Sequence, residues 1–273
     1  MNKHTLLILA LAIGALLVGS NTFASEAKAA PSLKGLQPNI ILVLTDDQGM
    51  GDLSCMGNTI LKTPHIDALY EKATRFTDFQ VSPTCAPTRA AIMSGRFPFE
   101  VGVSHTLMQR ERLAPKVVTF PEALQKAGYK TALFGKWHLG DEEEYLPQNR
   151  GFNEVLMHGA GGIGQYSFGD FEANAEDKYF DNVFLHNDTV VKTKGFCTDV
   201  FFEQANKFIT KNVKAKKPFF AYICTNAPHG PLHCPQKYID MYKGQSGRIA
   251  SFFGMITNID DNVGKTRALL KKL

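Results

Sequence analysis

The sequence predicts an α/β fold in which helices cover both faces of a largely parallel β-sheet. Two observations lead to this prediction. Apolar, strand-like runs alternate with amphipathic helical segments along the chain, and clusters of polar residues directly follow the strand-like runs. Because ligands of open α/β sheets bind at the carboxyl ends of the strands, these polar clusters also predict the place of a functional site.

The elements follow one another in a regular order. The run NIILVLT at residues 39–45 is rich in β-branched residues and predicts a strand buried on both faces. TPHIDALYEKAT predicts a helix with Thr63 as N-cap and Pro64 at its first position. TFPEALQKAG repeats this pattern, with Thr119 as the cap and Gly128 as the stop signal.

The second half of the chain continues the alternation. YKTALFGKWH, residues 129–138, reads as a strand that runs into a loop. A glycine-rich loop and an irregular polar surface are expected over residues 159–188. An amphipathic helix is predicted for residues 197–211, a buried strand for 218–226 and a long helix for 246–273.

The N-terminal segment is predicted to direct export of the protein. A basic start precedes an apolar run at residues 6–18, which is too short for a comfortable membrane span, and small residues follow it. Residues 1–24 are therefore expected to be a signal peptide, residues 25–37 a flexible leader and residues 38–273 the folded domain. A retained membrane anchor is the alternative. Cleavage would leave a periplasmic or secreted protein without stable membrane insertion.

Charge and cysteine content exclude other classes of protein. The net charge of +4 is spread along the chain and is not interleaved with aromatic residues, so no nucleic-acid partner is expected. An odd number of cysteines, five, leaves one without a disulfide partner in an oxidising compartment, although the other four could pair. No two cysteines form a C-x-x-C motif, which argues against a zinc ribbon.

Asp46 and Asp47 end the first predicted strand. Adjacent carboxylates repel each other, and a hard divalent cation such as Ca²⁺ or Mg²⁺, which prefers oxygen ligands, would relieve that repulsion. The alternative is a turn that ends the strand, in which aspartate is common.

Three basic residues follow the other two strands. Lys136 suits the binding of an oxyanion, and His138 can exchange protons near neutral pH. His229 lies between prolines in APHGP, as a positioned general acid might be expected to do. Each of the three is also compatible with an ordinary polar loop. The other histidines, including His158, are expected to be structural or surface residues.

Cys85 stands at the start of a predicted helix in SPTCAPTRAAIMSGR, four residues before Arg89. A helix N-terminus and a nearby arginine favour a thiolate nucleophile. A cysteine protease, however, has no use for paired aspartates, and a soft thiolate matches an oxygen-binding metal poorly. The conflict disappears if residue 85 presents oxygen instead of sulfur.

CAPTRAAIMSGR resembles the formylglycine motif of the type I sulfatases, which belong to the alkaline phosphatase superfamily. In that family the cysteine is oxidised to formylglycine, whose hydrated aldehyde is the nucleophile. The resemblance continues in order through PNIILVLTDDQGMGDLSCMG, TPHIDAL, GYKTALFGKWHLG, RGF at residues 150–152, and APHGP. Thr88 stands where the motif often has serine and keeps the hydroxyl. The resemblance implies an alkaline phosphatase-like layered fold.

The resemblance also implies a metal site and a nucleophile. Asp46 and Asp47 would bind Ca²⁺, with Mg²⁺ as the alternative, together with the formylglycine made from Cys85. Arg89 would hold the hydroxyl of the nucleophile. A formylglycine-generating or sulfatase-maturing enzyme would be the partner that modifies Cys85.

Three further roles follow from the same resemblance. Lys136 would bind the sulfate oxygens, and His138 would hydrogen-bond the formylglycine diol. His229 would contact the ester oxygen and protonate the leaving alcohol. The expected activity is hydrolysis of a sulfate monoester, either an aryl sulfate or a sulfated carbohydrate. A phosphonate monoester or phosphodiester hydrolase and a non-catalytic relative are the alternatives.

The family pattern continues beyond the last residue of this sequence. In the family, a helix like residues 256–273 is followed by a strand ending in Asp-Asn that completes the metal site, by a lysine that binds sulfate, and by a small C-terminal domain. The sequence therefore predicts an incomplete fold with exposed apolar edges and impaired activity. Asp260 and Asp261 are expected on the solvated face of that helix and not as replacement ligands.

Overall fold

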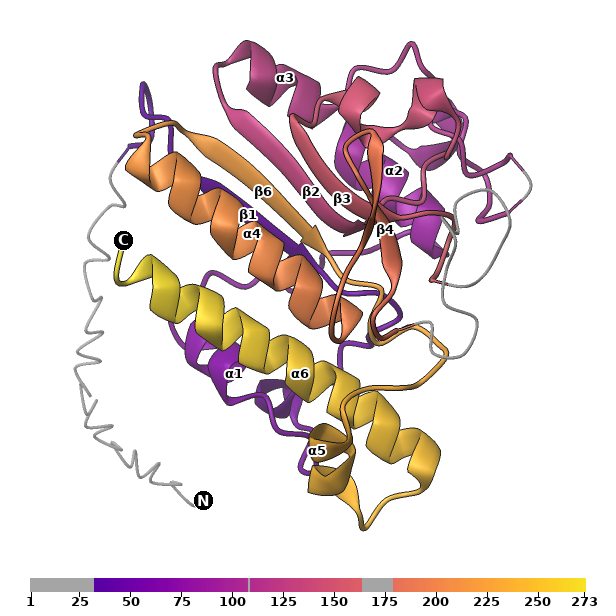
Figure 1. Ribbon diagram of the computed structural model, residues 1–273, viewed down its shortest axis with the longest axis vertical. Helices are drawn as coiled ribbons and strands as arrows, with labels where there is room; N and C mark the ends of the chain where they lie inside the picture. The colour runs from indigo at the N-terminus through magenta and orange to yellow at the C-terminus, as the bar shows by residue number, and fades with distance from the viewer. Residues whose placement is uncertain (1–31, 108, 164–178) are drawn as a thin grey trace, which may run out of the picture. The chain divides into compact units, whose positions relative to one another are not determined.

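The computed structural model describes residues 32–107, 109–163 and 179–273 (Figure 1). Residues 37–273 form one compact unit, and the preceding unit, which ends at Leu36, is described only over its last five residues. The predicted signal peptide lies outside the described residues. Among the helices of the described part, none is long and apolar enough to cross a membrane.

The described part contains a six-stranded sheet with the strand order β1-β6-β2-β3-β4-β5. The pairs β1–β6, β6–β2 and β2–β3 are parallel, and the pairs β3–β4 and β4–β5 are antiparallel. The predicted α/β fold with a largely parallel sheet is thus confirmed. The strands are β1 Ile40–Leu44, β2 Lys130–Lys136, β3 Glu154–His158, β4 Val183–His186, β5 Thr189–Lys192 and β6 Phe219–Cys224.

Helices pack on both faces of the sheet (Figure 1). Helix α4 packs on β2 and β6, α6 packs on α4 and α1, and α3 packs on β2. The α-helices are α1 Pro64–Tyr70, α2 Cys85–Ser94, α3 Phe120–Lys126, α4 Cys197–Lys214, α5 Gln236–Ile239 and α6 Gly247–Leu270. Short 3₁₀-helices are η1 Ser54–Met56, η2 Pro98–Val101, η3 Glu143–Tyr145, η4 Pro147–Arg150 and η5 Asp240–Tyr242.

Strand β2 shows how the two layers arise. Successive side chains of a strand point to opposite faces. Phe134 accordingly packs into the core formed with α4, whereas Leu133 packs into the core formed with Ala90 and Met93 of α2. All side chains of β2 except the first are buried, as a strand covered on both faces requires.

Local signals in the sequence set the helix ends. Helix α3 begins with a capping box, in which the Thr119 hydroxyl accepts from the Glu122 amide and the Glu122 carboxylate accepts from the Thr119 amide. Gly128 follows the helix at φ 88°, a left-handed conformation that glycine adopts without steric cost. Ser246 caps α6 by accepting from the Ile249 amide.

Two expectations are corrected by the structure, and the open question of cysteine pairing is answered. β1 is half buried, and not buried on both faces, because β6 is its one partner in the described sheet. The expected irregular stretch before residue 188 contains β4, with Phe184 fully buried; residues 164–178 of that stretch lie outside the described residues. All five cysteines lie in the described part, and no disulfide joins any two of them.

Candidate active site

The carboxyl ends of β1, β6 and β2 lie side by side, because these strands are parallel neighbours in the sheet. Asp46 and Asp47 follow β1, His229 follows β6, and Lys136 is the last residue of β2. The amide of Asp46 also donates to the carbonyl oxygen of Ala227 at 3.2 Å, which joins the first two loops. The structure therefore brings the three predicted polar clusters to one edge of the sheet.

A buried group of charges lies at the centre of this edge. The Lys136 ammonium forms an ion pair with Oδ2 of Asp46, and Nη2 of Arg89 lies 3.7 Å from Oδ1 of the same carboxylate. Asp46 is 4% exposed, Arg89 2% and Lys136 0%. Burial by itself would raise the pKa of Asp46, but the charges of Arg89 and Lys136 outweigh it and hold that pKa below its usual value.

The buried group has more positive than negative charge. Two cations, Lys136 and Arg89, face the single buried carboxylate of Asp46. Asp47 is 61% exposed, so solvent screens its charge. Because an uncompensated buried charge is costly, this edge of the sheet is suited to bind an anion.

Helix α2 supplies Arg89 and the predicted nucleophile. Cys85 is the first residue of α2 and is partly buried, and Arg89, one turn later, lies on the same side of the helix. Nη1 of Arg89 donates to the carbonyl oxygen of Lys136 at 2.7 Å, which ties α2 to the end of β2. The hydroxyl of Thr88 donates to the carbonyl oxygen of Ser82 at 2.5 Å and so fixes the segment that precedes Cys85.

His138 is held in one orientation. It is 4% exposed and has φ 58°, and its Nε2 donates to the carbonyl oxygen of Thr106 at 2.9 Å. Burial, with the nearby charge of Lys136, lowers the pKa of His138 to about 3, so the ring is neutral at pH 7. A neutral imidazole with its proton on Nε2 carries its lone pair on Nδ1. That nitrogen is buried and has no hydrogen-bond partner among the described residues.

His229 lies between two cis X–Pro bonds, Ala227–Pro228 and Gly230–Pro231. Its Nδ1 donates to the carbonyl oxygen of Gly230 at 2.7 Å. Its Nε2 lies 3.7 Å from Oδ2 of Asp47. Because Nδ1 is bound to Gly230, Nε2 is the ring nitrogen of His229 that remains for proton transfer.

His158, expected from the sequence to be a structural or surface residue, lies buried at the same edge of the sheet. It is the last residue of β3, pairs in register with Lys136, and is 2% exposed. Its Nδ1 donates to the carbonyl oxygen of Gly159 at 2.8 Å, and its buried Nε2 has no partner in the described part of the chain. The signal that could have identified it is its position at a strand end, like that of Lys136.

Only some of the predicted metal ligands are of the type that a hard cation prefers. The carboxylates of Asp46 and Asp47 offer the oxygen atoms that Ca²⁺ prefers, whereas the sulfur of Cys85 does not. Across the described residues, these three side chains do not form a group whose ligand atoms all lie within 4.8 Å of one another. In this structure Asp46 is turned toward Lys136 and Asp47 toward His229.

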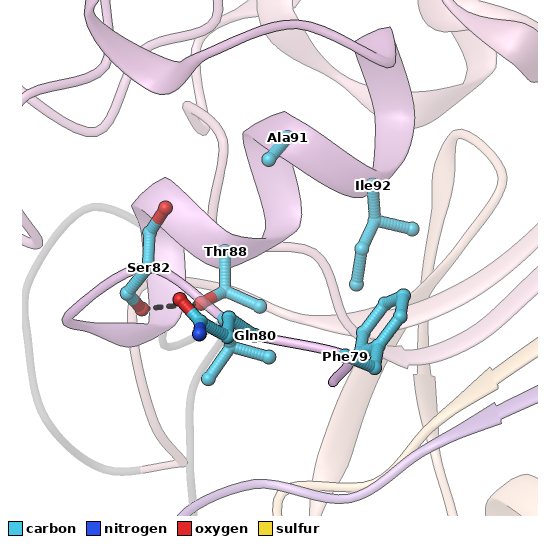
Figure 2. Close-up of a pocket in the computed structure, with 7 residues that line it drawn as sticks. Phe79, Gln80, Ser82, Thr88, Ala91 and Ile92 are labelled. Carbon is cyan, nitrogen blue, oxygen red and sulfur yellow. Dashed lines mark hydrogen bonds between the residues drawn. The ribbon is translucent and has the colours of Figure 1, made fainter. Parts of the chain in front are cut away.

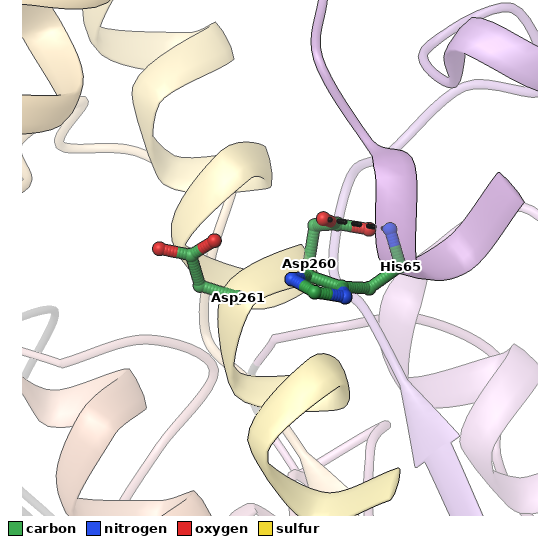
Figure 3. Close-up of side chains that lie close together, drawn as sticks. All are labelled: His65, Asp260 and Asp261. Atoms are coloured by element: carbon green, nitrogen blue, oxygen red, sulfur yellow. Dashed lines mark hydrogen bonds between the residues drawn. The ribbon is translucent and has the colours of Figure 1, made fainter. Parts of the chain in front are cut away.

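A different cluster, His65, Asp260 and Asp261, meets that distance criterion (Figure 3). Both oxygens of Asp260 are already engaged, because they accept from the amides of His65 at 3.1 Å and Ile66 at 2.7 Å. Asp260 is 0% exposed, which corrects the expectation of a solvated helix face. The carboxylate satisfies amides at the start of α1 and thus serves as a helix cap.

This cap also corrects the role expected for Thr63. Thr63 stands at the N-cap position of α1, but its side chain makes no capping hydrogen bond. Its hydroxyl instead donates to Asp67 at 3.0 Å and pairs with the hydroxyl of Ser54.

A hollow of about 360 Å³ lies beside α2, next to the segment that precedes Cys85 (Figure 2). Its lining is mostly apolar and includes no charged side chain, so it is not suited to an anionic ester. The anion-binding features are the strand ends described above. The hollow is lined by Phe79, Gln80, Val81, Ser82, Thr88, Ala91 and Ile92.

Comparisons with known proteins identify related sequences. Residues 38–273 match the sequence model of the family described as Sulfatase. The chain is 30% identical to the N-acetylgalactosamine-6-sulfatase of Canis lupus familiaris, over 86% of this chain and 47% of that protein. It is 29% identical to an arylsulfatase of Klebsiella aerogenes, over 90% of this chain and 52% of that protein.

A solved structure is similar as well. The crystal structure of Ps i-CgsB in complex with k-i-k-neocarrahexaose matches with a TM-score of 0.77 and 33% sequence identity, over 86% of this chain and 55% of that one. The chain spans about half the length of the curated relatives that it matches.

Proposed function

The chain belongs to the sulfatase family, and from this premise we propose that its strand-end site hydrolyses sulfate monoesters. One observation carries the proposal: Lys136 and Arg89 are buried against the single buried carboxylate of Asp46. A sulfate monoester is an anion, and bound at this edge it would balance the excess positive charge. Preorganised positive charge also stabilises the charge that develops on the oxygens in the transition state.

The proposed nucleophile is residue 85 after oxidation of its thiol to formylglycine by a maturation enzyme. The hydrate of this aldehyde supplies one hydroxyl for attack on sulfur and a second whose deprotonation releases the sulfate. Two observations support the proposal. Cys85 begins α2 on the same side as the buried Arg89, and an oxygen at this position removes the mismatch between sulfur and a hard cation.

Asp46 and Asp47 are the residues that would hold the metal, proposed to be Ca²⁺. When bound, the cation would supply Lewis-acid stabilisation of negative charge on oxygen. Lys136 would then bind sulfate oxygens as a point charge, and the guanidinium of Arg89 would hold the hydroxyl of residue 85. Arg89 is well placed for this, because its bond to the Lys136 carbonyl fixes the guanidinium between α2 and β2.

The two histidines would divide the proton transfers. His229, whose Nε2 lies 3.7 Å from Oδ2 of Asp47, would protonate the leaving alcohol. His138 is neutral, and its proton lies on Nε2, bound to Thr106. Its Nδ1 is therefore the atom that would accept a proton from the hydroxyl of residue 85.

We propose a carbohydrate sulfate or an aryl sulfate as the substrate class. The carbohydrate is supported by the similar structure that was solved with a neocarrahexaose. The proposed location is the periplasm or the extracellular space, because residues 1–24 have the pattern of a signal peptide.

Co-production of the chain with a sulfatase-maturing enzyme tests the nucleophile. Conversion of the thiol to the aldehyde lowers the mass of the peptide that contains Cys85 by roughly 18 Da, because oxygen replaces H₂S. The matched control is the Cys85→Ala variant, whose peptide should not change. A peptide that keeps its thiol mass under conditions in which another sulfatase is converted would contradict the formylglycine proposal.

Steady-state hydrolysis of 4-nitrophenyl sulfate and 4-nitrophenyl phosphate with added Ca²⁺ tests the reaction. We expect preference for the sulfate ester, and a loss of at least ~100-fold in kcat/KM in Lys136→Ala, the size typical of removing one group that stabilises transition-state charge. Turnover that is unchanged in Cys85→Ala would refute the assignment. Preference for the phosphate ester would instead favour the phosphonate or phosphodiester hydrolase.

A further inference from the structure

The segment that follows β3 packs directly on the ring of His138. A β-carbon placed on Gly161 would lie 2.5 Å from Cε1, 2.7 Å from Nε2 and 3.2 Å from Nδ1 of His138, and the first two distances are shorter than real contacts of this kind. Gly161 does not have a left-handed φ, so backbone conformation does not require glycine here. The close approach to the imidazole is therefore the reason that a side chain is excluded at this position.

Hydrogen bonds at both ends keep this segment in place. The amide of Ala160 donates to Oδ2 of Asp141 at 2.7 Å, and the amide of Ile163 donates to Oδ1 of Asn226 at 3.4 Å. Asp141 belongs to the loop after β2, and Asn226 belongs to the loop after β6. The segment is thus fixed to both neighbouring loops of the site and cannot retreat from His138 without breaking these bonds.

The ring of His138 is consequently confined from two directions. The Thr106 carbonyl binds Nε2 at 2.9 Å, and Gly161 packs on the Cε1 side of the ring, closer to Nε2 than to Nδ1. The ring nitrogen that remains for a reacting group is Nδ1, which is buried and has no partner among the described residues.

We propose that Gly161 is a positioning residue for His138: the absence of a side chain at residue 161 lets the imidazole keep the orientation in which Nε2 binds Thr106 and Nδ1 is left for a reacting group. The chemical consequence rests on the proposed function, whereas the steric relation between Gly161 and His138 does not. The test therefore measures the two parts separately.

The steric part is tested with a thermal-unfolding cycle of wild type, Gly161→Ala, His138→Ala and the double variant. Overpacking at a buried site should lower the Tm of Gly161→Ala by roughly 2–10 °C. In the His138→Ala background the ring is gone, so the same substitution should change Tm by less than about 1 °C. Gly244→Ala is the matched control, because it adds the same methyl group where nothing lies within 4 Å.

The chemical part is tested by kinetics on an aryl sulfate with the matured full chain. A displaced base should lower kcat of Gly161→Ala at least ~10-fold while KM stays within about twofold, since general-base catalysis contributes 10²–10⁴-fold. In the His138→Ala background, Gly161→Ala should have no further effect on kcat. A merely structural role of Gly161 would instead lower kcat in both backgrounds.

The outcomes separate the two proposals. Equal losses of Tm in both backgrounds, or an unchanged Tm together with an unchanged kcat, would overturn the positioning role of Gly161. A stability cycle that behaves as expected in a chain without sulfatase turnover would uphold the positioning role and count against the proposed function.

Discussion

Asp46→Asn is the substitution that tests the buried charge group most directly. In the folded chain the carboxylate of Asp46 faces the Lys136 ammonium and, at 3.7 Å, the Arg89 guanidinium, and all three side chains are at most 4% exposed. Asparagine keeps the size of the side chain but removes its charge. Two buried cations would then lack a buried counter-charge.

The expected cost follows from this geometry. Removing one partner of a buried ion pair typically destabilises a protein by about 3–5 kcal/mol, because the remaining charge stays desolvated. For a domain of this size, about 2–4 °C in Tm corresponds to each kcal/mol, so Tm should fall by roughly 6–20 °C. The neighbouring substitution Asp47→Asn removes a charge that is 61% exposed and 3.7 Å from His229. It should change stability by no more than about 1 kcal/mol.

Urea unfolding and thermal melts of both variants, in the presence of a chelator, provide the measurement. The chelator keeps any divalent cation from contributing to the difference between the two aspartates. The two variants are adjacent in sequence and identical in chemistry, so the difference between them reports burial and pairing alone. Equal losses in Asp46→Asn and Asp47→Asn, or a cost below about 1 kcal/mol for Asp46→Asn, would refute the buried charge group as described.

Three further outcomes are expected. The folded pKa of Asp46 is held below 3.8, so the stability that its carboxylate contributes is present above about pH 4 and is lost as the pH falls through the folded pKa. In melts at decreasing pH, the Tm of wild type should therefore approach the Tm of Asp46→Asn. A difference in Tm that stays constant with pH would count against this. Arg150→Met removes the donors to three carbonyl oxygens within residues 113–117 and should lower the free energy of unfolding in urea by at least about 2 kcal/mol. A smaller loss would mean that water replaces the guanidinium. Asp260→Ala removes the cap of α1 and should cost about 1–2 kcal/mol, whereas Asp261→Ala, lacking that role, should cost less; a reversed order would contradict the capping assignment.

The prediction from sequence was most successful where the signal is local. Thr119 is predicted from the sequence as a helix cap, and its hydroxyl accepts from the amide of Glu122, three residues later, at the start of α3. The same holds for the fully buried strand β6, whose apolar run needs no long-range information to be recognised. Such signals report the chain's own conformational preferences, which exist before any packing.

The prediction failed where a remote residue changes the environment of a local motif. Thr63 has the right type and position for a cap, yet a carboxylate from Asp260, almost 200 positions away, binds the amides of α1 instead. His158 stands in a weak local context and is buried beside Lys136 only because β3 pairs with β2. No periodicity or capping signal records which strands become neighbours.

The sequence by itself predicted strands β1, β2 and β6 and helices α1, α2, α3, α4 and α6 in their order, and it singled out the candidate site residues from Asp46 to His229. It could do so because helix and strand periodicities, caps and the cysteine motif are properties of short segments. The tertiary structure alone decided that β1, β6 and β2 are neighbours, that Lys136 and Arg89 are buried against one carboxylate, and that Gly161 packs on His138. Strand order and burial arise from contacts between distant segments, so they become visible only once the chain is folded.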